Sequence, residues 1–245
     1  MLTNERQNQI LNYLKDKKSV SIPTLSKILY VSEATARRDI KALSDLGLVE
    51  RYHGGALFPE STDEQPMPFR IRKSSVEKNK VVQKALGALP SFRSVFLDGS
   101  STVLALAEHL NLMSKTVITN SLEIALLLSR RPEINLTMLG GNVRYNTNTT
   151  AGSFTAKQIE LISVDLMICS CAAVKTSECA ERSIEQAELK RAVFERSERR
   201  ILLVDNTKFG AFGTYSLLKL TDFDAVITNK KPSDDILSLG ANIIF

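Results

Sequence analysis

The stretch Ser32-Glu33-Ala34-Thr35-Ala36-Arg37-Arg38-Asp39-Ile40 has the pattern of a short helix with two adjacent arginines. Ser32 suits the N-cap position, because its side chain can accept a hydrogen bond from a first-turn amide. Apolar residues continue at helical spacing from Ile40 to Leu43 and Leu46, and this face is expected to pack on a core. The opposite face is polar and basic and carries Thr35, Arg37, Arg38 and Lys41. The stretch predicts a DNA recognition helix.

Small residues and two further helical patterns support this interpretation. Ala34 and Ala36 are expected to keep the helix slim enough to approach a DNA groove closely. Residues 6–14 and 21–29 precede it with apolar residues at helical spacing. The step through Tyr30-Val31 has the length of a helix-turn-helix corner, so three helices are expected in this region.

A hairpin is expected directly after the third helix. Gly47 suits a helix C-cap. Residues 48–52 then alternate like a strand, Gly54-Gly55 breaks the pattern, and residues 56–58 would form the return strand. Such a hairpin is the wing of a winged helix-turn-helix unit, where side chains meet phosphate or the minor groove. The predicted DNA-binding residues are Ser32, Thr35, Arg37, Arg38, Lys41, Arg51, His53 and Gly54.

The alternative interpretation of Arg37-Arg38 is a solvated helix face, which is the commoner role of two adjacent arginines. Arg51 and His53 could likewise be ordinary exposed residues of a hairpin. A capped helix that follows a short helix and precedes a Gly-Gly hairpin is a compound pattern, however, and each part has a physical reason in groove binding. The compound pattern therefore favours DNA binding.

The chain has 245 residues, enough for a small domain and a larger one with its own core. Its formal net charge of +5 has the sign that suits a polyanionic partner. The longest apolar run, residues 124–128, is far too short to cross a bilayer, and the first residues lack the apolar region of a signal peptide. A cytoplasmic location without membrane contact is expected.

Three cysteines and two histidines are the candidates for metal or redox chemistry. Cys169, Cys171 and Cys179 have no histidine near them, because His53 and His109 stand elsewhere in the chain, and a zinc site would need a fourth ligand. The cysteines are expected to be reduced and buried. No metal site and no cofactor are therefore predicted.

Residues 59–68 are polar and punctuated by proline, which is typical of a linker. Beyond Glu77, helical patterns alternate with short apolar runs, which predicts an α/β domain around a mainly parallel sheet. The expected organisation is a winged helix-turn-helix domain over residues 1–58, a linker over 59–76 and an effector-sensing and oligomerisation domain over 77–245. The expected strands lie at residues 94–97, 115–119, 134–139, 166–168, 200–204 and 225–227.

Ligands of such sheets bind beside the carboxyl ends of the strands. Residues 98–102, Asp-Gly-Ser-Ser-Thr, follow the first of these strands and open a helix, which suits a phosphate or another anion. Each polar exit alone could be a plain turn, but four of them in one sheet predict a small anionic ligand. The predicted ligand residues at the strand ends are Asp98, Gly99, Ser100, Ser101, Thr102, Asn120, Ser121, Gly140, Gly141 and Lys208.

Taken together, these motifs resemble those of the DeoR family of bacterial transcriptional regulators over essentially the whole chain. The resemblance implies a winged helix-turn-helix joined to a sensor domain similar to ribose-5-phosphate isomerase. It also implies a regulator, commonly a repressor of carbohydrate genes, that binds double-stranded operator DNA, responds to a phosphorylated sugar and forms a dimer or tetramer. The matching motifs are Glu5-Arg6-Gln7, Val31-Ser32, Thr35, Arg37-Arg38-Asp39, His53-Gly54-Gly55-Ala56, Glu77-Lys78, Asp98-Gly99-Ser100-Ser101-Thr102, Thr119-Asn120-Ser121, Gly140-Gly141, Lys190-Arg191 and Asp205-Asn206-Thr207-Lys208-Phe209-Gly210.

Two segments depart from the family pattern. Gln186-Ala187 stands where the family usually has Glu-Ala before the Lys190-Arg191 pair, with Glu185 next to it, and this correspondence places Gln186 in the effector site. The preceding loop has Ala172-Ala173 and Ser177 where glycines are usual. A DNA-binding regulator with a degenerate, effector-insensitive sensor domain is therefore the alternative.

A sugar-phosphate isomerase is the rival from another class of protein. Its proton transfer needs a positioned carboxylate base and usually a second acid or a lysine. Asp98 and Lys208 could supply these groups, but Asp98 fits a binding turn better, and the amide of Gln186 cannot act as a base. No catalytic residue is predicted, and the protein is expected not to be an enzyme.

Overall fold

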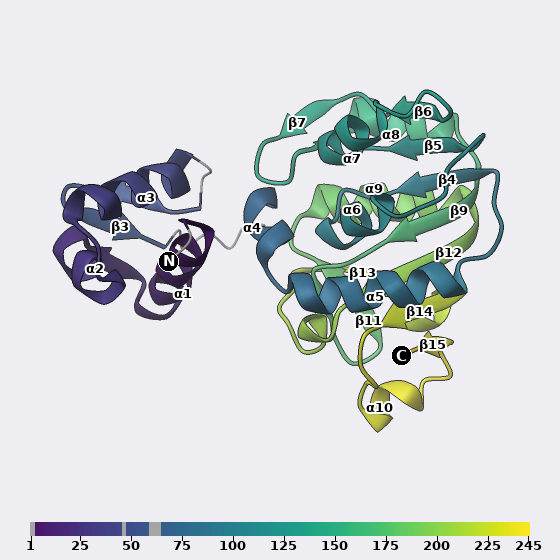
Figure 1. Ribbon diagram of the computed structural model, residues 1–245. Coiled ribbons are helices and arrows are strands. Elements are labelled where there is room, and N and C mark those ends of the chain that lie inside the picture. The colour runs from purple at the N-terminus through teal and green to yellow at the C-terminus, as the bar shows by residue number, and fades with distance from the viewer. Residues whose placement is uncertain (1–2, 46–47, 59–64) are drawn as a thin grey trace. The chain divides into compact units, whose positions relative to one another are not determined.

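The chain folds into two compact units, Met1–Phe69 and Arg70–Phe245, which are described separately (Figure 1). The computed structural model describes residues 3–45, 48–58 and 65–245. Leu46 and Gly47, at the expected end of the recognition helix, and residues 59–64 of the expected linker lie outside the described residues.

Within residues 3–45 and 48–58, the N-terminal unit has three helices and a small antiparallel sheet. Its elements are α1 (Thr3–Lys17), β1 (Ser19–Ser21), α2 (Ile22–Leu29), α3 (Glu33–Asp45), β2 (Glu50–Tyr52) and β3 (Gly55–Leu57). β3 is the central strand, with β1 on one side and β2 on the other. The expected helices and hairpin are confirmed. The structure adds β1, which the sequence did not predict.

Apolar residues from all three helices form the core of this unit. Ile10 and Leu14 of α1, Leu25 of α2 and Ile40 and Leu43 of α3 are almost completely buried. Their spacing within each helix places them on one face, which is the physical reason that these segments are helical in the folded chain.

One prediction about α3 is wrong. Ala36 is fully buried in this core and does not face solvent. It stands four residues before Ile40 and seven before Leu43, so helical geometry places all three on the buried side. Ala34 is exposed, so its small side chain allows another molecule to approach α3 closely at that position.

A short helix, α4 (Met67–Arg72), leads through a tight turn into α5 (Ser75–Ala88). α4 lies within residues 59–76, where a linker was expected. Pro68 is compatible with this helix, because a proline in the first turn removes no hydrogen bond that the helix would make. Ser74, in the turn between the helices, adopts the left-handed conformation with a φ of +54°.

The C-terminal unit is built on a seven-stranded sheet in the order β15-β14-β12-β9-β4-β5-β6. Every neighbouring pair is parallel, which confirms the expected parallel sheet. Its central strands are buried on both faces, as parallel sheets require. The strands are β4 (Ser94–Leu97), β5 (Thr116–Thr119), β6 (Asn135–Met138), β9 (Val164–Cys169), β12 (Ser197–Val204), β14 (Ala225–Thr228) and β15 (Ile243–Ile244).

Helices cover both faces of this sheet. α5, α6 and α7 lie side by side across one face (Figure 1), while α8 and α9 pack together against the other. The chain runs from β4 to β5 on one side, whereas β9 lies on the other side of β4. This reversal is the switch point at which open α/β sheets bind ligands. The remaining helices are α6 (Ser101–Ala107), α7 (Leu122–Leu128), α8 (Ser153–Glu160), α9 (Ile184–Glu195) and α10 (Asp234–Leu237).

Short antiparallel elements that the sequence did not predict lie beside the main sheet. β7 (Asn142–Arg144) and β8 (Thr149–Ala151) form a hairpin, and β10 (Ala173–Val174), β11 (Glu178–Glu181) and β13 (Tyr215–Lys219) form a three-stranded sheet. None of these strands contains a continuous run of four apolar residues, so no buried strand was indicated there.

The three cysteines are free and buried, as predicted. Burial raises the pKa of the Cys169 thiol well above its ordinary value, which keeps this sulfur protonated and unreactive. Within residues 3–45, 48–58 and 65–245, no three or more His, Cys, Asp or Glu side chains are grouped so that they could hold a metal ion. The same residues contain no helix with the length and hydropathy needed to span a membrane.

Candidate DNA interface and effector site

α3 presents a polar, basic face opposite its buried side. Ser32 caps the helix, because the Thr35 amide donates to its Oγ at 3.2 Å, and the two hydroxyl oxygens lie 3.0 Å apart. Arg38 and Lys41 are exposed further along the helix. The structure therefore brings these predicted residues onto one exposed surface.

Arg37 is also exposed, but it has a partner within the helix. Its guanidinium donates to the Glu33 carboxylate one turn earlier, at 2.9 Å. An exposed pair of this kind is worth about 0.5 kcal/mol, so a DNA phosphate could replace Glu33 at little cost. Arg38 has no ion-pair partner among the described residues. Its guanidinium could therefore contact DNA without first leaving a carboxylate.

The hairpin of β2 and β3 carries Arg51 and His53, both exposed. Gly54 follows at the turn with a φ of +94°, a conformation that favours glycine. Its carbonyl accepts a hydrogen bond from the Ile22 amide at 2.8 Å, which holds the hairpin on the start of α2. The wing residues are thus held on the helix-turn-helix by a backbone contact.

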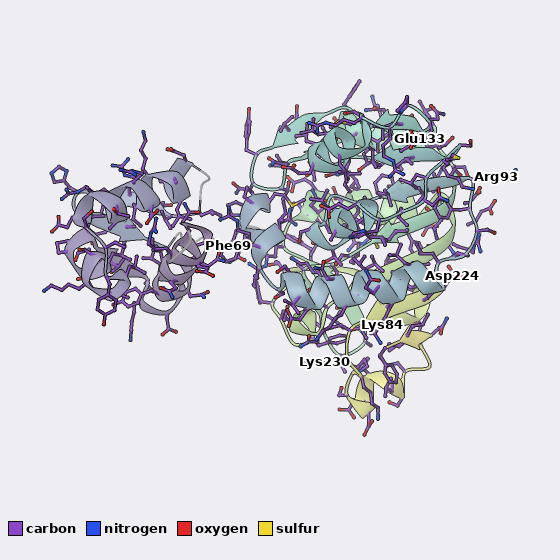
Figure 2. The ribbon with its side chains drawn as sticks, in the orientation of Figure 1. Phe69, Lys84, Arg93, Glu133, Asp224 and Lys230 are labelled. Carbon is purple, nitrogen blue, oxygen red and sulfur yellow. The ribbon has the colours of Figure 1, made fainter. Side chains whose placement is uncertain are left out.

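The second candidate site lies at the carboxyl edge of the parallel sheet. Figure 2 shows the opposite edge, where Arg93, Glu133 and Asp224 precede β4, β6 and β14. At the carboxyl edge the ends of β4 and β9 meet, since the Ser170 amide donates to Asp98 Oδ2 at 3.2 Å. This contact lies at the switch point of the sheet.

Asp98 is completely buried and belongs to a charged triad. Its Oδ1 accepts from the Ser100 amide at 3.0 Å, and its Oδ2 lies 2.7 Å from Lys190 Nζ. Lys190 also donates to the Ser170 carbonyl at 2.7 Å and to Glu181 Oε1 at 2.6 Å. Burial alone would lower the pKa of Lys190, but the two carboxylates raise it well above its ordinary value. The triad therefore shapes the turn after β4.

Two helices open directly at this edge. Ser100 Oγ accepts from a first-turn amide of α6 at 3.2 Å, and Ser121 Oγ accepts from a first-turn amide of α7 at 3.3 Å. Ser101 and Thr102 are buried in the first turn of α6. The predicted hydroxyl residues are therefore gathered at the start of helices, as the sequence indicated.

Gln186 of α9 contacts β8 at the same edge. Its Nε2 donates to Thr149 Oγ1 at 2.8 Å. A Cβ atom at Gly99 would overlap the Thr149 methyl group and would lie 3.8 Å from Asn120 Oδ1. Asn120 Nδ2 donates to the Thr150 carbonyl at 3.0 Å, while Oδ1 is buried without a hydrogen-bond partner among the described residues. The ends of β4 and β5 are thus joined to α9 through β8.

Gly140 and Gly141 contact α8. The Gly140 amide donates to Gln158 Oε1 at 2.9 Å, and its carbonyl accepts from Thr155 Oγ1 at 2.7 Å. A Cβ atom at Gly141 would overlap the Thr155 hydroxyl. Close packing against α8 therefore explains Gly141 without a ligand, whereas a Cβ atom at Gly140 would make only contacts of 3.4 Å or more.

Lys208 ends the short helical turn Asn206–Lys208 after β12 and has a second lysine, Lys78 of α5, as a neighbour. Burial, followed by the charge of Lys208, lowers the pKa of Lys78 to about 7. Asp205, at the start of the turn, is buried, and its Oδ1 accepts from the Thr207 amide at 3.0 Å. Its Oδ2 has no hydrogen-bond partner in the part of the chain that the structure describes.

Three residues of the site were not among those predicted from the sequence: Lys78, Thr149 and Lys190. Lys78 and Lys190 belong to the motifs Glu77-Lys78 and Lys190-Arg191, on which the family resemblance rests. Their presence in these motifs could have identified them as site residues. Thr149 had no signal, because only the unexpected hairpin of β7 and β8 brings it to Gly99.

Family models match both units of the chain. A model described as the DeoR-like helix-turn-helix domain matches residues 6–62. A second, described as the DeoR C terminal sensor domain, matches residues 73–230.

Curated relatives match along nearly the whole chain. The HTH-type transcriptional regulator GolR of Listeria innocua is 36% identical over 93% of this chain and 91% of its own length. The HTH-type transcriptional repressor GlcR of Bacillus subtilis is 30% identical over 98% of this chain and 93% of its own. The glycerol-3-phosphate regulon repressor of Escherichia coli is 27% identical over 98% and 96%.

Among solved structures, ribose 5-phosphate isomerase A from Methanocaldococcus jannaschii is similar to 54% of this chain and 53% of its own, with a TM-score of 0.39 and 18% identity.

Proposed function

Because the chain belongs to the DeoR family of DNA-binding transcriptional regulators, we propose that it represses genes of carbohydrate uptake or metabolism and that a phosphorylated sugar controls its binding to operator DNA. The family membership supports DNA binding. The name of the glycerol-3-phosphate regulon repressor supports a phosphorylated compound as the controlling ligand.

The surface of α3 supports a recognition role for this helix in the major groove. We assign base and phosphate contacts to its exposed polar residues and backbone contacts to the wing. Ser32 acts mainly as the cap, since its hydroxyl already accepts the Thr35 amide. The proposed contacts are Ser32, Thr35, Arg37, Arg38, Lys41, Arg51, His53 and Gly54.

The observation that carries the effector proposal is the set of buried polar atoms without partners at the carboxyl edge of the sheet. Asn120 Oδ1, Asp205 Oδ2 and Thr228 Oγ1 are buried and lack hydrogen bonds among the described residues. Buried polar groups are normally satisfied, so a ligand that carries hydroxyl groups is the natural partner. Lys208 and Lys78 add positive charge for a phosphate at the same edge.

The predicted site residues divide into two roles in this proposal. We assign direct contacts with the effector to Ser100, Ser101, Thr102, Asn120 and Lys208. The others shape the site, because their contacts described above are with the protein itself: Asp98, Gly99, Ser121, Gly140, Gly141 and Gln186.

Catalysis is not part of the proposed function. The carboxylates of Asp98 and Glu181 both form ion pairs with the Lys190 ammonium, and Gln186 offers an amide in place of a base. A further carboxylate at this edge, Asp205, has an oxygen without a partner among the described residues, and we assign that oxygen to a hydroxyl group of the effector and not to proton transfer. We further propose that the protein forms a homo-oligomer, a dimer or a tetramer, because two DNA-binding units on a palindromic operator make more contacts than one. We also propose that it acts in the cytoplasm.

The test is binding of the purified protein to DNA from its own gene neighbourhood, at two salt concentrations, with and without a panel of sugar phosphates. Specific, salt-sensitive binding that one sugar phosphate abolishes would support the proposal. Specific binding that no phosphate changes would favour the effector-insensitive alternative. Interconversion of ribose and ribulose phosphates by the protein would favour the enzyme.

A further inference from the structure

Lys78 of α5 holds the end of the preceding helix. The residue is only 5% exposed, and its ammonium donates to the Arg70 carbonyl and, at 2.7 Å, to the Lys73 carbonyl. These carbonyls belong to the C-terminal end of α4 and the turn that follows it. The last carbonyls of a helix have no partner within the helix, and a cation beside them is favourable. Lys78 is therefore the cap of α4.

The same ammonium has charged neighbours that belong to the candidate effector site. The charged groups around it are Lys208 and Asp205 from the turn after β12, and Arg70 and Lys73 from the end of α4. An ammonium has three N–H donors, and two of those of Lys78 are used by carbonyls. For the third, the described residues provide no hydrogen-bond acceptor. An anion beside Lys208 would therefore find an unused donor.

Arg70 is attached to the site in a second way. Its guanidinium Nη2 lies 3.5 Å from the Thr147 carbonyl. Thr147 Oγ1 lies 2.6 Å from Thr149 Oγ1, which also accepts from Gln186. The backbone of Arg70 is thus held by Lys78, and its side chain rests on the hairpin that covers Gly99.

On these contacts, and resting on the proposed function, we propose that Lys78 binds the anionic group of the effector with its third N–H while it holds the Arg70 and Lys73 carbonyls, so that effector binding fixes the end of α4. The ligand class is a phosphate monoester dianion. Lys78 contacts the ligand directly and acts on α4 as a positioning residue.

The position of α4 in the chain gives this contact its consequence. Arg70 is the first residue of the C-terminal unit, and its neighbour Phe69 is the last of the N-terminal unit. Phe69 packs edge-on against Phe58, with ring centroids 6.4 Å apart, beside the winged-helix core. A change in how Arg70 is held therefore reaches a residue of the DNA-binding unit across one peptide bond.

The low pKa of Lys78 agrees with this assignment and supplies a readout. Above neutral pH the amine is mostly neutral when the site is empty. A dianion beside it would favour the ammonium, so binding should take up a proton. A residue that acted only as a helix cap would not couple anion binding to proton uptake.

The experiment uses the full chain with inorganic phosphate as the probe and compares wild type with Lys78→Met and with Lys80→Met, an exposed lysine of the same helix. Calorimetry at about pH 8.5, where phosphate is almost wholly the dianion, is run in buffers of different ionisation enthalpy to count protons. Hydrogen exchange of residues 67–72 is measured with and without phosphate.

Wild type and Lys80→Met should take up close to one proton per phosphate bound, and phosphate should slow exchange in α4. Lys78→Met should bind phosphate more weakly, take up no proton and show no slowing. If Lys78→Met takes up as many protons per phosphate as wild type, or if phosphate slows exchange in its α4 as much as in wild type, the role assigned to Lys78 is wrong. The proposed function would not be affected by that result. Failure of the wild type to bind phosphate would instead contradict the proposed function, and the inference with it.

Discussion

Arg6 of α1 and Asp39 of α3 form a paired contact on the buried side of the recognition helix. Arg6 Nη2 donates to Asp39 Oδ1 at 2.9 Å, and Nε donates to Oδ2. The side chains are 12% and 4% exposed. Two parallel hydrogen bonds between a guanidinium and a carboxylate restrict the orientation of both groups. The pair therefore fixes how α3 lies on α1, with Arg38 directed to the exposed side.

Substitution Arg6→Ala should destabilise the N-terminal unit by about 2 kcal/mol, because it leaves the buried Asp39 carboxylate without its partner. Arg37→Ala is the control, since it breaks an exposed pair and should cost less than about 0.5 kcal/mol. Urea unfolding monitored on the helical signal measures both. Equal effects of the two substitutions would show that the Arg6 contact contributes no more than a surface pair.

Substitution Arg38→Ala should weaken specific DNA binding, because this guanidinium is exposed on the side of α3 that we propose enters the major groove. If Arg38 reads a guanine, the loss is on the order of 1–3 kcal/mol and sequence preference relaxes at one base pair. Binding to an operator and to its single-base variants measures this. Arg93→Ala removes the same charge from the C-terminal unit and serves as the control. A uniform loss on operator and random DNA would identify Arg38 as a phosphate contact.

Substitution Lys190→Met should destabilise the C-terminal unit by about 3–5 kcal/mol, because it removes the ammonium that contacts the buried carboxylates of Asp98 and Glu181. Lys175→Met, at an exposed position, should change stability little. Since the pKa of Lys190 is raised, its contribution is fully present below about pH 10.5 and is lost only as the pH rises through the higher folded value. Denaturant unfolding of the C-terminal unit checks the first effect, and a loss no larger than that of Lys175→Met would contradict it.

The pH dependence of stability should differ between wild type and Lys78→Met. Lys78 titrates near 10.5 in the unfolded chain and near 7 in the folded chain. Between these values the unfolded state binds more protons, so this group makes the free energy of unfolding increase with pH. The stability of wild type relative to Lys78→Met should therefore increase from pH 7 towards pH 10.5, as measured by urea unfolding. A constant difference would show that the pKa of Lys78 is not lowered.

The sequence predicted the elements whose pattern is local. Helical and strand periodicities involve only a few neighbouring residues, so they can be recognised in the sequence. They predicted the cap at Ser32, the basic face of α3, the parallel strands and the polar residues at the strand ends. Contacts between segments that are distant in the sequence could not be predicted in this way. Asp39 stands in the stretch that predicted the recognition helix, yet its partner Arg6 stands on another helix. Asp98 was selected for a ligand, yet its carboxylate binds Lys190. Such contacts depend on the final packing.

The close approach of Gly99 to Thr149 offers a test of the effector site. Substitutions at these two positions distinguish a steric overlap with the Thr149 methyl group from the loss of the hydrogen bonds of the Thr149 hydroxyl. Gly99→Ala places a methyl group on Thr149 Cγ2, so the hairpin of β7 and β8 must shift. We expect the variant to lose its response to the sugar phosphate that releases wild type, while operator binding persists because the N-terminal unit is unchanged.

The matched variant is the double substitution Gly99→Ala with Thr149→Ser. Serine lacks the Cγ2 methyl group but keeps the hydroxyl that accepts from Gln186 and lies 2.6 Å from Thr147 Oγ1. The double variant should therefore recover the response, and Thr149→Ser alone should retain it. Operator-binding titrations of the three variants with the sugar phosphate measure this. If the double variant stays as unresponsive as Gly99→Ala, the overlap with Thr149 is not the reason that position 99 requires glycine.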